Sequence, residues 1–135
     1  MRHRKGFTLL EMLIAVAIAA IIMTMAFPTY SHSRIRVERN EGRLALLRHA
    51  TAQVNYFIVH GRYASDMTEL GHSSAISTTE GGRFNLEMIS ADDDGFVIRA
   101  TRIAVQTDPE CRWFSVDQSH RRASGPAEPD RCWFR

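Results

Sequence analysis

The sequence has little lysine, and its positive charge is unevenly placed. Lys5 is the only lysine among 17 basic residues, against 15 acidic ones. Arg2, Arg4 and Lys5 lie in the first five positions, and without them the formal net charge of +2 would become −1. A chain whose positive charge depends on its first residues is not expected to bind nucleic acid generically through its remaining part.

Cysteine is also scarce, which excludes a small scaffold held together by many disulfides. Cys111 and Cys132 are the only two cysteines among 135 residues. In an exported chain two cysteines indicate one disulfide, whereas in a cytosolic chain they would be two thiols. The compartment therefore has to be settled from the rest of the sequence.

Sequence motifs of metal and catalytic sites are missing. The six histidines stand alone at positions 3, 32, 49, 60, 72 and 120, without an HExxH or a paired CxxC motif. His49 and His60 share a helical face but are about 16 Å apart, too far to bind one metal ion. The "ADDDG" segment (91–95) lacks the ligand spacing of an EF-hand and predicts an Asp-Gly hairpin turn. We expect no enzyme, no metal and no cofactor.

What the sequence does have is one long apolar run with a single charge. Residues 7–27 comprise 21 residues whose only charged side chain is Glu11. A helix of that length is about 31 Å long, close to the hydrocarbon thickness of a bilayer. The basic residues before the run predict that its amino end stays in the cytoplasm.

Three interpretations of this run compete. A cleaved secretory signal has a shorter apolar region, and the small residues that could mark its cleavage site lie inside the run (Ala15, Ala17, Ala19 and Ala20). A plain membrane anchor explains the length but not Glu11. The third interpretation places a cut before the run, between Gly6 and Phe7, and it is the one we favour.

A cut after Gly6 would give Glu11 a partner. It creates a free amine on Phe7, and Glu11 lies four residues further on, one helical turn away. A carboxylate inside a membrane costs a few kcal/mol or more unless it is paired, and a positive amine at the same depth offsets that cost. The amine can belong to the same chain or to a neighbouring one. The second arrangement would set the register of packed helices, and small residues let such helices approach closely.

The residues around the predicted cut resemble those of a known protein family. The segment "KGFTLLEMLIAVAIAAII" resembles the class III leader and N-terminal segment of type IV prepilins and pseudopilins. The resemblance implies that a prepilin peptidase cleaves after Gly6 and N-methylates Phe7, and that Glu11 takes part in subunit assembly. It also places Pro28 where pilins typically have a helix-bending proline. Such a subunit waits in the inner membrane before it enters a filament.

The pattern beyond the run predicts that the helix continues. Pro28 should bend it, because proline removes a backbone hydrogen bond and clashes with the preceding turn. An apolar stripe recurs at spacings of three and four and predicts the helix face that covers a sheet (Leu47, Ala50, Val54 and Phe57). Gly61 is expected to end the helix. Gly42 is interpreted either as a tolerated exposed glycine or as a hinge.

The last half of the chain predicts a short helix and then strands. Residues 65–71 have the capping residues of one short helix. Alternating apolar residues predict three or four antiparallel strands, among them residues 83–89, 96–105 and 111–117. The fold class is therefore α+β: a long kinked helix, membrane-spanning in its first half, packed on a small antiparallel sheet.

The whole chain is similar to a type IV pilin, most like the PilE-type minor pilins. The resemblance implies a leader (1–6), a transmembrane and assembly helix (7–27), a periplasmic globular domain (28–135) and a C-terminal region bounded by a Cys111–Cys132 disulfide. It implies one membrane span in the inner membrane, with the N-terminus in the cytoplasm, followed by assembly into a surface pilus. Expected partners are other pilins, the prepilin peptidase and the inner-membrane assembly platform.

The expected function is that of a minor subunit that joins or primes the fibre for twitching motility, adhesion or DNA uptake. Two alternatives stay open. One is a pseudopilin of a type II secretion system. The other is a pilus-borne DNA receptor using Arg121, Arg122 and Arg131, although Glu128 and Asp130 in the same segment dilute that charge. We rank DNA binding below the structural role.

Overall fold

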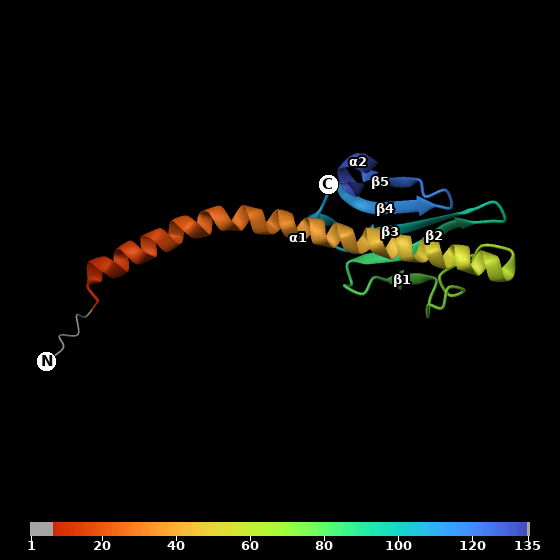
Figure 1. Ribbon diagram of the computed structural model, residues 1–135, viewed down its shortest axis with the longest axis horizontal. Coiled ribbons are helices and arrows are strands. Elements are labelled where there is room, and N and C mark those ends of the chain that lie inside the picture. The colour runs from red at the N-terminus through yellow and green to blue at the C-terminus, as the bar shows by residue number, and fades with distance from the viewer. Residues whose placement is uncertain (1–6, 135) are drawn as a thin grey trace. The chain divides into compact units, whose positions relative to one another are not determined.

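The fold combines one long helix with an antiparallel sheet (Figure 1). The computed structural model describes the backbone of residues 7–134 and the side chains of residues 7–24 and 33–134. The predicted leader (1–6), including Gly6, lies outside the described residues. The chain forms two compact units, which divide between Arg34 and Ile35.

Helix α1 (Leu9–His60) contains 52 residues and has a cap at each end. At its start, the Thr8 hydroxyl oxygen accepts the Glu11 N–H at 3.3 Å, which satisfies one of the free donors of the first turn. At its end, Gly61 has a φ of 71° and donates its N–H to the Phe57 carbonyl at 2.8 Å. The predicted stop at Gly61 is confirmed, and glycine fits there because φ is positive.

In the first unit, the apolar side chains of α1 are exposed. Phe7 and Leu9 are each 80% exposed, and Ile22 is 63% exposed. Across the part of the chain that the structure describes, no helix is both long and apolar enough to cross a membrane. Helix α1 continues through position 28, whose side chain lies outside the described ones, so the predicted bend at Pro28 stays a prediction.

The second unit contains a five-stranded sheet in which every neighbouring pair is antiparallel and the strands follow sequence order. The strands are β1 (Ile76–Thr78), β2 (Phe84–Ala91), β3 (Phe96–Arg102), β4 (Cys111–Asp117) and β5 (Arg122–Pro126). The predicted α+β class is confirmed, but the prediction of three or four strands was wrong by one or two. β1 has only three residues, and β5 contains Gly125 and Pro126, so neither shows a clear apolar alternation.

Two short helical elements complete this unit. The 3-10 helix η1 (Val105–Thr107) connects β3 to β4, and helix α2 (Pro129–Trp133) follows β5. Figure 1 shows α2 beside β5, where the chain ends, and β1 at the opposite edge of the sheet. The disulfide and α2 therefore lie on the β4–β5 side of the sheet.

The core lies between one face of the sheet and residues 35–60 of α1. The inward positions of β2, β3 and β4 supply most of it, with contributions from α1, the connecting loop and α2 (Leu46, Ala50, Met67, Phe84, Leu86, Phe96, Ile98, Ala100, Phe114, Val116, Cys132 and Trp133). Alternate residues along β3 are buried, as expected for a strand with one covered face.

The helix face that covers the sheet differs from the predicted apolar stripe. Val54 is 41% exposed and Phe57 37% exposed, although Ala50 is buried as predicted. The buried positions run at spacings of three and four and mix apolar residues with polar ones and a glycine (Glu38, Gly42, Leu46, Ala50 and Gln53). We refer to these five residues as the buried face of α1.

Polar and small residues fit the buried face because each has a specific neighbour. The Gln53 side chain donates to the Ala64 carbonyl and accepts the Ala64 N–H, both at 2.8 Å. Gly42 faces the Phe84 ring, and a methyl group on Gly42 would lie 3.1 Å from Cζ of Phe84. Gly42 is therefore buried, so the interpretation of it as an exposed glycine was wrong.

Candidate functional site: the assembly segment and the disulfide region

The first candidate site is the amino-terminal part of α1, residues 7–24, which we call the assembly segment. Its apolar side chains are exposed, and the exposed Glu11 carboxylate has no hydrogen-bond or ion-pair partner within the described range. Thr8 and Glu11 also have the spacing of a capping box, so Glu11 could in part serve the start of its own helix. An exposed apolar segment with one unpaired carboxylate is suited to packing against other helices.

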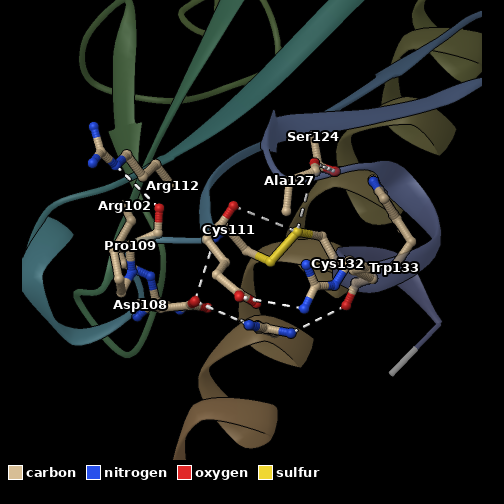
Figure 2. The surroundings of a disulfide bond; sticks show 12 residues. Arg102, Asp108, Pro109, Cys111, Arg112, Ser124, Ala127, Cys132 and Trp133 are labelled. Atoms are coloured by element: carbon tan, nitrogen blue, oxygen red, sulfur yellow. Dashed lines mark hydrogen bonds and ion pairs between the residues drawn. A yellow bond between two sulfur atoms is a disulfide. The ribbon is translucent and has the colours of Figure 1, made fainter.

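The second candidate site is the region around the Cys111–Cys132 disulfide (Figure 2). The bond joins the start of β4 to α2, with the two Cα atoms 5.7 Å apart, and both cysteines are buried. The predicted disulfide is confirmed. Trp133, next to it, donates its indole N–H to the Ala123 carbonyl at 2.9 Å, so α2 is held to β4 by the disulfide and to β5 by a hydrogen bond.

Asp108 links this region to α1. The Arg39 guanidinium donates to both carboxylate oxygens of Asp108, at 2.7 and 2.9 Å, and the Cys111 N–H donates to one of them at 3.3 Å. Arg39 also reaches the Arg131 carbonyl at 3.2 Å. Burial alone would raise the pKa of Asp108, but the hydrogen bonds and charge of Arg39 outweigh burial and hold that pKa below its usual value.

A second buried pair lies beside the first. Arg102 donates to the Glu38 carboxylate at 2.7 Å, and the two side chains are 1% and 5% exposed. Arg102 also lies 3.5 Å from Asp108, and its guanidinium is over the Phe84 ring, 4.8 Å from the centroid. Arg43 donates to the Trp133 carbonyl at 2.7 Å. Buried charges in such a network hold one arrangement, because breaking a pair leaves an uncompensated charge.

Sequence reasoning missed this network. The charged residues between positions 34 and 48 look like a solvated helix face, and nothing in their spacing identifies Glu38 and Arg39 as facing the sheet. One sequence signal was present: Glu38 lies four residues before Gly42 and eight before Leu46, on the same helical face. The network fixes the C-terminal region to α1, and so sets which surfaces the second unit presents.

The arginines considered for DNA binding have partners in the structure. Arg121 pairs with Asp117 at 2.7 Å, and Arg131 lies 3.4 Å from Glu110. Arg122 stacks over Trp133, 5.2 Å from the ring centroid. Carboxylates thus partly compensate the charges of Arg121 and Arg131, although Arg121 remains 79% exposed.

No metal centre of three or more histidine, cysteine or carboxylate ligands occurs among the residues with described positions. The "ADDDG" segment forms the predicted turn between β2 and β3, in which an Asp92 carboxylate oxygen accepts the N–H groups of Asp94 and Gly95 at 3.0 and 2.9 Å. The Asp92 carboxylate therefore stabilises the turn in which it lies.

Comparisons with known proteins identify the family of the chain. Residues 1–27 match the prokaryotic N-terminal methylation motif, and residues 28–115 match the family described as type IV minor pilin ComP, DNA uptake sequence receptor. The type IV major pilin protein PilE1 of Neisseria gonorrhoeae is 32% identical over 131 residues, which are 97% of this chain and 74% of that protein. PilA of Myxococcus xanthus, also a type IV major pilin, is 30% identical over 103 residues, 76% of this chain and 45% of that one.

A solved structure shows the same fold. The non-core minor pilin PilV of Neisseria meningitidis superposes with a TM-score of 0.54 at 23% identity, covering 70% of this chain and 89% of PilV. A long capped helix with an exposed apolar start, packed on an antiparallel sheet with a C-terminal disulfide, defines a pilin-like filament subunit. The chain belongs to the type IV pilin family. Members of this family are structural subunits that associate with other pilins in a pilus.

Proposed function

We propose that this chain is a minor subunit of a type IV pilus, processed by a prepilin peptidase that cuts after Gly6 and methylates Phe7. Before assembly, residues 7–27 hold it in the inner membrane, with the N-terminus in the cytoplasm and residues 28–135 in the periplasm. The observation that carries this proposal is the match of residues 1–27 to the N-terminal methylation motif. The exposure of the apolar side chains from Phe7 to Met23 supports it.

In the filament, Glu11 pairs with a neighbouring chain and so sets the register between the two helices. Its carboxylate lacks a partner among the described residues, and the methylated amine of another subunit's Phe7 is a cation of the right charge at the same depth. Further along α1, apolar side chains that point away from the sheet support lateral packing: Val37 is 66% exposed, Leu44 54% and Ile58 74%. They recur at multiples of seven residues, which keeps them on one helical face.

Mass spectrometry of the intact protein from the membrane fraction tests the processing step. The expected mass is that of a chain beginning at Phe7 with one additional methyl group. A chain that begins after Ala20 would contradict the proposal, because the apolar segment would then be a cleaved secretory signal.

Substitution of Glu11 tests the assembly step. Glu11→Ala should leave the protein in the membrane and sharply lower its recovery in sheared pili. Thr8→Val is the control, because it removes the hydroxyl that accepts the Glu11 N–H but keeps the carboxylate. Equal loss in both variants would mean that Glu11 acts through the helix cap alone.

A pseudopilin of a type II secretion system would be processed in the same way. The two assignments therefore differ only in which fibre the chain enters, a type IV pilus or a secretion pseudopilus. Copurification separates them: we expect the chain in sheared type IV pili and its loss from the cell surface when the pilus assembly platform is removed. Whether the pilus serves twitching motility, adhesion or DNA uptake is read from the phenotype of a deletion strain.

A second candidate function is DNA reception, which is favoured by the match of residues 28–115 to a family described as a DNA uptake sequence receptor. Arg121 and Arg122 are the exposed cations we would test first. Against this function, Arg121 pairs with Asp117, and Arg122 stacks on Trp133. We expect weak, steeply salt-dependent binding to duplex DNA. Submicromolar affinity at near-physiological salt that disappears in Arg121→Glu/Arg122→Glu would reverse our ranking.

A further inference from the structure

Two histidines meet between α1 and the loop that connects it to the sheet. His49 lies on α1, and His72 lies between the turn at residues 65–71 and strand β1. Their Nε2 atoms are 2.8 Å apart and their ring centroids 4.9 Å apart, so the two nitrogens face each other with the rings behind them. The sequence showed only that His49 and His60 share a helical face, too far apart to bind one metal ion, and did not reveal His72 as a neighbour of His49.

The outer nitrogens of the two rings are held in place. His49 Nδ1 is 2.7 Å from the Ala45 carbonyl, and His72 Nδ1 is 2.9 Å from the Ser77 hydroxyl. Because the Ala45 carbonyl can only accept, His49 must carry its proton on Nδ1, and its Nε2 therefore has a free lone pair. Without a metal, the 2.8 Å contact requires His72 to carry its proton on Nε2 and to donate it to His49 Nε2, while the Ser77 hydroxyl donates to His72 Nδ1. In the other neutral tautomer His72 Nδ1 donates to the Ser77 oxygen, which frees the second Nε2 for a metal ion.

This is the arrangement that metal-binding histidines have in proteins. The ligating nitrogen points inward while the other ring N–H is held by a carbonyl or hydroxyl, which fixes both tautomer and ring orientation. Burial lowers the pKa of His49, so its imidazole is neutral at neutral pH, as a metal ligand must be. The adjacent cation is Arg48, whose side chain is 67% exposed and pairs with Glu80.

We infer that His49 and His72 form a binding site for one transition-metal ion of the zinc class, with water in the remaining coordination positions. The ion takes the place of the proton that the two Nε2 atoms otherwise share. Imidazole nitrogens suit Zn²⁺, Cu²⁺ and Ni²⁺. Tetrahedral ligation needs the two nitrogens about 3.3 Å apart, and His72, which lies outside the helices and strands, can make the small movement that this requires.

Such an ion would link α1 to the connecting loop. The start of the loop is held on α1 by the hydrogen bonds of Gln53 with Ala64, eight residues before His72, and by the ring contact of Phe57 with Tyr63. A metal link at His72 would fix the far end of the same loop. The consequence is a second unit whose loop surface is more rigid, and whose thermal stability is higher, when zinc is bound.

Calorimetric titration of the full-length chain in detergent with ZnCl₂ tests the site, using protein without a histidine tag at neutral pH. We expect one saturable equivalent per chain, and at least tenfold weaker binding in His49→Gln and in His72→Gln. His60→Gln is the matched control: its ring also lies against a carbonyl one turn back, Tyr56 at 3.0 Å, but within the described side chains it stacks on the Tyr56 ring and faces no second histidine. It should change the affinity less than twofold.

Two further measurements guard against a variant that simply fails to fold. Ser77→Ala keeps both ligands and removes only the group that holds His72, so it should weaken zinc binding about tenfold. Zinc should raise the melting temperature of the wild type and of His60→Gln, but not of His72→Gln. Equal affinity in the wild type and His72→Gln, or an unchanged wild-type melting temperature in saturating zinc, would overturn the inference and leave a histidine pair that only shares a proton.

Discussion

At the scale of single residues, the packing of the second unit depends on a glycine in the core. Gly42 is buried because the Phe84 ring occupies the space of its missing side chain. Phe84 is itself fully buried, with the Arg102 guanidinium over its ring and Phe114 beside it. The ring therefore has little freedom to yield to a larger residue at position 42.

Gly42→Val should destabilise the second unit by about 1–3 kcal/mol, because added methyl groups in a packed core force neighbouring side chains to shift. Asn40→Val is the control, since position 40 is exposed on the same helix and receives the same β-branched residue. Urea denaturation of both variants measures the effect. Equal stability of the two would show that Phe84 can move, and that Gly42 has no packing role.

Asp108 predicts a dependence of stability on pH. The folded state holds its pKa below the usual value, so the folded chain binds fewer protons than the unfolded chain as the carboxylate titrates. The free energy of unfolding contributed by Asp108 is therefore present above about pH 4 and is lost as the pH falls through the folded pKa. Glu41, whose pKa is also lowered despite burial, by Thr79 and Arg83, acts in the same direction.

Asp108→Asn should cost about 3 kcal/mol at pH 7, because it leaves the partly buried Arg39 and the buried Arg102 without this charged neighbour. Thermal unfolding at pH 7 and at pH 3 should show a smaller loss on acidification in this variant than in the wild type. Asp93→Asn, at an exposed position, is the control and should follow the wild type. A variant whose pH dependence matches the wild type would exclude Asp108 as a source of acid sensitivity.

At the scale of elements, long periodic segments were predictable and short ones were not. The strand at residues 111–117 was predicted with its observed bounds, because its apolar alternation is clear. Residues 65–71 form turns rather than the predicted short helix: Asp66 accepts the N–H of Thr68 at 2.7 Å, as an N-cap would, but no helix follows. A capping signal with too few residues behind it closes a turn instead.

The buried face of α1 shows a second limit of sequence reasoning. Hydrophobic periodicity predicts that the buried face of a helix is the one with apolar side chains. This face instead contains Glu38 and Gln53, whose polar groups form hydrogen bonds with Arg102 and Ala64. Those partners are far away in sequence and become visible only when the sheet is in place. For the candidate sites, the disulfide could be predicted and the Asp108 network could not, while the role of the assembly segment stays a prediction.

The disulfide is the element-scale feature whose removal is simplest to interpret. With a sequence separation of 21 residues, its loss in Cys111→Ala/Cys132→Ala should cost about 3 kcal/mol, mainly through a less constrained unfolded state. Tryptophan fluorescence should show that Trp133 becomes more exposed before the rest of the unit unfolds, because α2 keeps only noncovalent contacts. Unchanged stability would mean that Arg39, Arg43 and the Trp133 hydrogen bond suffice to hold α2.

At the scale of the whole molecule, the two sides of α1 in the second unit differ in exposure. Leu46 is fully buried against the sheet, and Leu44, two residues earlier, is 54% exposed. The sheet uses one side, and under the proposed function neighbouring subunits use the other. The same substitution at these two positions separates folding from assembly.

Leu46→Ala should lower the free energy of unfolding by about 2–5 kcal/mol, because it leaves a cavity in the core. Leu44→Ala should change it by about 0.5 kcal/mol or less, yet lower recovery in sheared pili. Denaturation of the purified proteins and quantification of each variant in pili provide the two measurements. Full incorporation of Leu44→Ala would show that this side of α1 does not contribute to filament packing.

The sequence order of the five strands has a consequence for how the chain reaches its fold. Each strand from β2 onward pairs with the strand made just before it, so no part of the sheet has to wait for a distant segment. Pairing between consecutive strands keeps contacts local, which favours rapid folding. The bond between Cys111 and Cys132 requires α2, which follows the last strand, so oxidation joins α2 to a sheet whose strands can already be paired.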